Sequence, residues 1–98
     1  MFMNIRRYRI GDGQRDEVVR RVDEGWADQL RNEPGFLTYH VVASAPDELI
    51  SVTTCLDEQS LAKVVIKSAE WVGVHLMGIE VTLQDQRQGM VVSHLGGE

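Results

Sequence analysis

The chain has 98 residues, a formal net charge of -5 and a pI of about 5.1. This length fits one domain, so residues 1–98 are treated as a single folding unit. The acidic balance excludes a broad basic surface and therefore a nucleic-acid partner. No apolar stretch approaches the roughly 18 residues that span a bilayer, which predicts a soluble, cytoplasmic protein without a membrane partner.

Residues 1–10 predict a strand, because side chains that favour opposite environments alternate along them. Met3 and Ile5 belong to one face, and Asn4, Arg6 and Tyr8 belong to the other. The arginine indicates that its face is incompletely buried or lines a cleft.

Residues 14–32 predict a helix with a continuous apolar stripe, made of Val18, Val22, Trp26 and Leu30. Asp12, in the glycine-rich turn before it, is expected to cap its N-terminus. Gly25 is unfavourable inside a helix, so we interpret it as a point of close packing against a sheet.

Pro34 and Gly35 end this helix near the middle of the chain, because proline cannot donate to a helix and glycine tolerates a left-handed backbone. Residues 36–44 and 49–56 then predict two strands joined by a hairpin turn. The second of these strands contains Cys55, the one cysteine of the chain. A lone cysteine excludes an intramolecular disulfide and is expected here as a small buried thiol.

Asp57 is the predicted cap of a second helix, whose apolar spacing continues past residue 72. Ser68 offers a second cap, so this segment is either one helix or two short helices joined near Lys67. Trp71 and His75 lie one turn apart and share a helix face.

Residues 79–84 alternate as a strand, and residues 85–89 are polar and typical of a turn. Residues 90–95 predict a further strand, or the same strand continued past a bulge. The element order is β-α-β-β-α-β, which predicts an α+β, ferredoxin-like antiparallel sheet with both helices on one face. The other face would stay bare and apolar, so we expect a homodimer.

The sequence contains a run from Asn32 to Tyr39, with Pro-Gly-Phe at its centre, a run from Ile50 to Thr53 and a run from Asp57 to Ala62. Together these three segments resemble the antibiotic biosynthesis monooxygenase family. The resemblance spans roughly residues 3–84 and includes the spacing of the elements. It implies a dimeric α/β barrel, in which two sheets pack face to face, the helices lie outside, and each subunit has a cleft between its sheet and its helices.

The family resemblance implies several alternative activities. Some members oxidise polycyclic aromatic molecules without metal or flavin, some degrade haem, and others have no known activity. We therefore expect a small cofactor-independent monooxygenase that acts on an aromatic or quinone-like molecule and has no metal. Two alternatives stay open at this point: a non-catalytic dimeric domain whose cleft is filled by side chains, and a haem-binding relative.

This chain departs from its relatives at two positions. Many members have a tryptophan where this chain has Leu56. Haem-degrading members combine a strand asparagine, a tryptophan in the second helix and a later histidine. Asn4 and His75 fit the outer two places, but Val65 stands near the middle one. These departures weigh against haem chemistry.

The candidate catalytic residues are His75 and Asn4, and the candidate ligand-binding residues are Trp71, Phe36 and Tyr8. An imidazole that faces a cleft can take a proton near neutral pH, and an indole can stack on a flat aromatic ligand. The alternative for His75 is packing at a helix end, and for Trp71 it is a place in the core. An open cavity touching Asn4 and His75 would favour an enzyme, whereas a cleft filled by Trp71 and Phe36 would favour a non-catalytic domain.

Overall fold

A computed structural model of the chain describes residues 1–96. The elements, in chain order, are β1 (Phe2–Ile10), α1 (Arg15–Arg21), the π-helical η1 (Val22–Trp26), α2 (Ala27–Leu30), β2 (Phe36–Ala45), β3 (Glu48–Cys55), α3 (Glu58–His75) and β4 (Val81–Met90). The first three helical segments follow one another without a break, so the predicted β-α-β-β-α-β order is confirmed.

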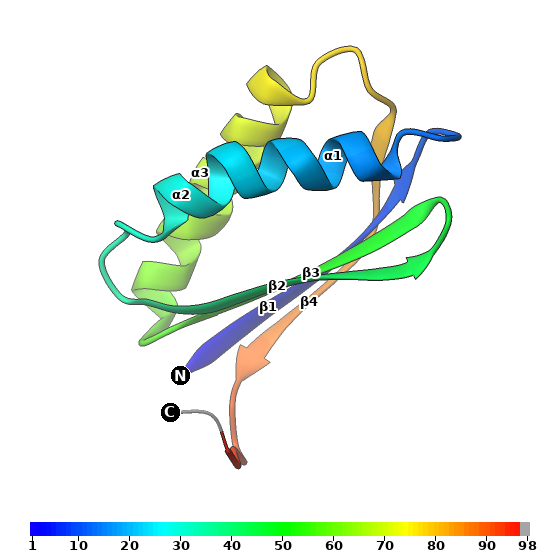
Figure 1. Cartoon of the computed structure of the whole chain (residues 1–98). Helices are drawn as coiled ribbons and strands as arrows, with labels where there is room; N and C mark the ends of the chain where they lie inside the picture. Colours follow the sequence, from blue (N-terminus) through cyan, green and yellow to red (C-terminus); the bar gives the residue numbers. More distant parts are fainter. Residues whose placement is uncertain (97–98) are drawn as a thin grey trace.

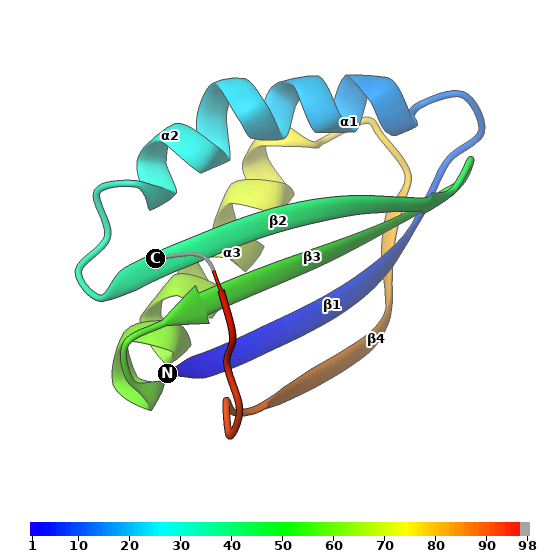
Figure 2. The same ribbon diagram turned by 60° about the horizontal axis from the view of Figure 1, so that its bottom comes forward.

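The four strands form one antiparallel sheet in the order β2-β3-β1-β4 (Figure 2). The helices all lie over one face of this sheet, with α1, η1 and α2 running as one rod beside α3 (Figure 1). This is the predicted α+β, ferredoxin-like fold, and it leaves the second sheet face without a helix.

The core lies between the helices and the covered sheet face. Trp26 and Leu30 are almost fully buried there, which confirms the apolar stripe predicted for the first helix. Leu61 on α3 is also fully buried. Cys55 is also fully buried, and burial raises the pKa of its thiol. Among residues 1–96, no helix is long and apolar enough to cross a membrane.

The two predicted helix caps differ in outcome. Asp57 caps α3 as predicted, because its carboxylate accepts a hydrogen bond from the Ser60 backbone N–H at 2.8 Å. Asp12 does not cap α1. Gln14 occupies that position instead, without a capping side-chain hydrogen bond. The helix α3 is continuous through Ser68, so the alternative of two short helices is wrong.

Gly25 packs against a helix rather than against the sheet. A Cβ atom built on it would lie 2.9 Å from Cζ2 of Trp71, which is on α3. The small residue therefore lets the indole of Trp71 lie close to the backbone of η1. Segments of π-helix such as η1 are uncommon and often occur beside functional sites.

The C-terminal part differs from the sequence prediction. Residues 85–89 belong to β4 rather than to a turn, and no strand continues beyond Met90 within the described chain. Because β4 is an edge strand whose side chains are mostly exposed, its polar composition is compatible with a strand. The strand β4 does contain a bulge. It lies between Leu83 and Asp85, which pair with Tyr8 and Arg7, so it precedes the segment where the sequence predicted it.

The uncovered sheet face is apolar but only partly open. Ile5 and Val42 are exposed on it, by 39% and 47%. Residues 91–96 run back over this face (Figure 2). A groove between this C-terminal segment and the sheet is lined by Met3, Val52 and Leu95, among other residues.

Candidate functional site

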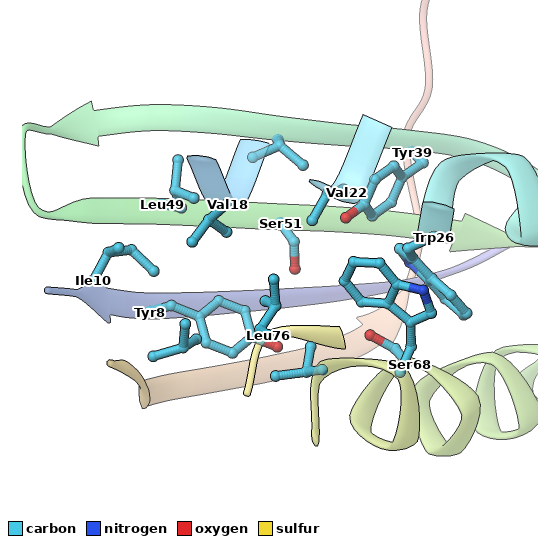
Figure 3. A pocket seen from close by; sticks show the side chains of 14 residues that line it. Tyr8, Ile10, Val18, Val22, Trp26, Tyr39, Leu49, Ser51, Ser68 and Leu76 are labelled. Carbon is cyan, nitrogen blue, oxygen red and sulfur yellow. The ribbon is translucent and has the colours of Figure 1, made fainter. Parts of the chain in front are cut away.

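A small cavity lies between the covered sheet face and the helices (Figure 3). The residues that line it include Tyr8, Tyr39, Leu49, Ser51, Val22, Trp26, Ser68, Trp71 and Leu76. Its volume is about 40 Å³, room for about three water molecules. A drug-sized ligand needs roughly 300 Å³ or more, so an aromatic ligand enters only if part of this wall moves.

Polar groups from three strands reach this cavity because of the sheet register. Tyr8 on β1 lies opposite Leu49 on β3, and Ser51 follows two residues later on the same face. Tyr39 enters from β2, where it lies opposite Thr53. Figure 3 shows the hydroxyl groups of Tyr39 and Ser51 turned into the space beneath the helices.

Both tyrosines are kept in the neutral phenol form. Burial raises the pKa of Tyr8, and the positive charge of Arg6 opposes this shift. Burial also raises the pKa of Tyr39, helped by Tyr8 and Asp23 and opposed by Arg6. Neutral phenols donate hydrogen bonds, so they suit an oxygen substituent of a bound molecule.

The wall on the helix side is aromatic. Trp71 packs on Trp26 with ring centroids 6.5 Å apart. On its outer side, Trp71 stacks on His75 at 4.9 Å, with the ring planes 22° apart. Trp71 therefore separates the cavity from the surface, where His75 is exposed. A ligand that displaced the Trp71 side chain would meet this imidazole.

The structure brings only some of the predicted site residues together. Tyr8 and Trp71 line the same cavity. Phe36, which lies opposite Cys55, lines a separate pocket beside α2 and not this cavity. Phe36 therefore does not fill this cavity, and Trp71 forms part of its wall.

Asn4 and His75 lie outside the cavity lining. Asn4 is 2% exposed, and its amide nitrogen donates to the side-chain oxygens of Gln88 at 3.0 Å and Gln86 at 3.2 Å. The backbone oxygen of His75 accepts a hydrogen bond from Nη1 of Arg21 at 3.1 Å. Asn4 thus organises β4, and His75 lies against the first helix.

Tyr39, Ser51 and Ser68 were not among the predicted site residues. Alternation along the predicted strand 36–44 separates its residues into two faces, but the sequence carries no signal for which face meets the helices. The pairing that brings Tyr39 into the same cavity as Tyr8 is a long-range property of the sheet.

The arrangement does not fit haem. The Asn4 amide is engaged with two glutamines, His75 lies outside the cavity, and the half-buried Val65 stands where haem-degrading relatives have tryptophan. In residues 1–96, no three His, Cys, Asp or Glu side chains lie close enough together to hold a metal ion.

Comparison with known proteins agrees with this fold. A dimeric ferredoxin-like protein from an uncultured marine organism is 15% identical, with 98% of each chain covered and a TM-score of 0.74. SnoaB, a cofactor-independent oxygenase from Streptomyces nogalater, is 11% identical, with 98% of this chain and 97% of SnoaB covered and a TM-score of 0.70. MhuD, in a mutant solved with manganese protoporphyrin IX, is 17% identical, with 99% of this chain and all of MhuD covered and a TM-score of 0.72.

The curated proteins give no significant match. The family described as antibiotic biosynthesis monooxygenase matches residues 1–63, which include β1, β2, β3 and the start of α3. Trp71 and His75 lie beyond the matched segment. Because the match covers more than half of the sequence, the chain belongs to the antibiotic biosynthesis monooxygenase family.

Proposed function

We propose that the protein is a cofactor-independent monooxygenase that acts on a small aromatic or quinone-like molecule. The observation that carries this proposal is the mixed character of the cavity, which combines an apolar aromatic wall with the phenols of Tyr8 and Tyr39. A few polar groups in an otherwise apolar pocket fix the orientation of a bound molecule. The structural similarity to SnoaB is consistent with this chemistry.

In the proposed reaction, an electron-rich substrate itself reduces O₂. An enolisable ring CH₂ group loses two hydrogens and gains one oxygen atom as C=O, while the second oxygen atom leaves as water. The protein supplies a dry pocket and orientation. Tyr8 and Tyr39 would donate hydrogen bonds to ring oxygens, and Trp71 would stack on the ring after it swings outward.

The remaining candidates take roles that fit their positions. His75, on the outer side of Trp71, would accept the proton that the substrate loses. Asn4 would act as a positioning residue through Gln86 and Gln88. Phe36 would line the neighbouring part of the cleft beside α2.

We also propose that two copies pair through their uncovered sheet faces. The apolar side chains on this face and the likeness to a dimeric ferredoxin-like protein support a homodimer. The apolar part of this face that residues 91–96 leave exposed is better covered by a second copy than left in water.

The second candidate function is a non-catalytic domain. The small cavity volume favours it, because Trp71 occupies space that a substrate would need. In that case the aromatic wall is part of the core, and no ligand displaces it.

Oxygen uptake with anthrone as substrate separates these two functions. The enzyme hypothesis predicts that anthraquinone forms in a 1:1 ratio to the oxygen consumed, without added metal or flavin.

Tyr39→Phe should lower kcat/KM about tenfold, because it removes one hydrogen bond to the reacting molecule. Tyr39→Phe is matched by Val74→Ala, a change at an exposed position of α3. No uptake above the uncatalysed rate, in the purified protein with several enolisable ketones, would favour the non-catalytic domain.

A further inference from the structure

Arg6 on β1 has buried donor atoms that nothing in the described chain satisfies. Its Nε and Nη1 atoms are buried and have no hydrogen-bond partner within residues 1–96. None of the ion pairs found among those residues includes Arg6. A guanidinium is always charged, and leaving its buried N–H groups without acceptors is costly.

The sheet register places Arg6 beside the cavity. Arg6 lies opposite Ser51, which lines the cavity, and opposite Gln86 on the other side. Its guanidinium carbon is 5.6 Å from the ring centroid of Tyr8, so it lies over one of the two phenols. The charge of Arg6 also acts on Tyr39, the other phenol of the cavity.

Of the two residues opposite Arg6, Gln86 already has its side-chain oxygen engaged. The side-chain oxygen of Gln86, directly opposite, instead accepts a hydrogen bond from the amide of Asn4 at 3.2 Å. The network of Asn4, Gln86 and Gln88 is thereby self-contained. Arg6 is not itself one of the residues that line the cavity, but it lies on the same sheet face as Tyr8 and Ser51, which do line it, and its Nε and Nη1 atoms have no hydrogen-bond partner within residues 1–96.

We infer that Arg6 binds an ionised ring oxygen, an enolate or a phenolate, of the aromatic molecule that occupies this cavity. A charge-assisted hydrogen bond from a guanidinium to an anionic oxygen is roughly twice as strong as a neutral one. Arg6 therefore selects the ionised form of the ligand, while the neutral phenols of Tyr8 and Tyr39 donate to the same region. The inference rests on the proposed function in one respect, since it takes the cavity as the substrate site.

A pair of probes that differ in one acidic proton tests this inference. The first is 2-hydroxy-1,4-naphthoquinone, which is ionised at neutral pH, and the second is its methyl ether, 2-methoxy-1,4-naphthoquinone. Binding is measured without oxygen, by quenching of tryptophan fluorescence and by calorimetry. The native protein should bind the hydroxy compound at least about tenfold more tightly, because only this compound offers an anionic oxygen.

Arg6→Gln should abolish this preference by weakening the hydroxy compound alone, and Arg6→Lys should restore part of it. Arg9→Gln is the matched control, because Arg9 lies on the same strand, carries the same charge and is exposed on the other face. Since Arg6→Gln removes unsatisfied donors, its melting temperature should not fall below that of the native protein.

Three outcomes would overturn the inference: neither probe binds, the native protein binds both equally, or Arg6→Gln keeps the preference. A preference for the hydroxy compound that depends on Arg6, without oxygen uptake in the anthrone assay, would leave the inference intact and remove the proposed function. Conversely, oxygen uptake in the anthrone assay, combined with a binding preference that is unchanged in Arg6→Gln, would support the proposed function and overturn the inference about Arg6.

Discussion

At the scale of single residues, the chemistry of the cavity comes from two buried phenols and from Arg6, whose buried donors have no partner within residues 1–96. The sequence contains two tyrosines, and both line the cavity. Burial raises the pKa of each above the ordinary value of 10.0. For such a group, the folded state holds its proton at a pH where the unfolded state has lost it. Stability should therefore be unaffected below about pH 10 and fall above it.

A spectroscopic titration checks this expectation. Tyrosinate absorbance in the native protein should rise only well above pH 10, together with unfolding, whereas a urea-unfolded sample should titrate near pH 10. Tyr39→Phe should keep the folded state to a higher pH. A native protein in which both tyrosines titrate near pH 10 while the fold persists would contradict the burial described here.

At the scale of elements, the contact between η1 and Trp71 shapes the helical wall of the cavity. The sequence correctly placed a close contact at Gly25, but it assigned the wrong partner. A glycine inside a predicted helix indicates that a neighbouring group packs closely there, but only the folded structure identifies that group. The Asp12 cap failed for a similar reason, because a capping residue forms its bond only if the backbone turns at that position.

Two glycine substitutions in the helices are expected to have opposite effects. Gly25→Ala should lower the free energy of unfolding by about 1–2 kcal/mol, because its methyl group would overlap with Trp71. Gly73→Ala is the matched control on α3, where no side chain or neighbouring element of residues 1–96 lies within 4 Å of an added Cβ. It should raise stability by about 0.5–1 kcal/mol through helix propensity. Urea unfolding midpoints test both, and equal effects at the two positions would refute the close contact.

At the scale of the whole molecule, the sequence was sufficient for the fold and insufficient for the site. The order of elements and the apolar stripe of the first helix are local patterns, and the structure confirms them. The meeting of Tyr8, Tyr39 and Arg6 depends on pairing between β1, β2 and β3, which no local pattern records. Residues 79–84 were predicted as a strand, but residues 85–89, the polar second half of β4, were misread as a turn, because an edge strand has little apolar alternation to detect.

Pairing of two copies through the uncovered sheet face gives the last prediction. Ile5→Lys places a charge on this apolar face, opposite Val52 and opposite Arg87. It should weaken dimerisation about a hundredfold or more while the monomer stays folded. Ile66→Lys, at an exposed position of α3, is the control. Sedimentation velocity over a concentration series measures both, and a native protein that stays monomeric at high concentration would exclude this assembly.

Cys55 adds a practical consequence. Its thiol is fully buried and its pKa is raised, so the folded protein should resist maleimide reagents. A cysteine introduced on the surface would then take a spin label or a fluorophore selectively, with no need to remove the native one. Pairs of such labels would report distances within one copy and across two, and they would show whether the Trp71 wall swings outward when a quinone is added.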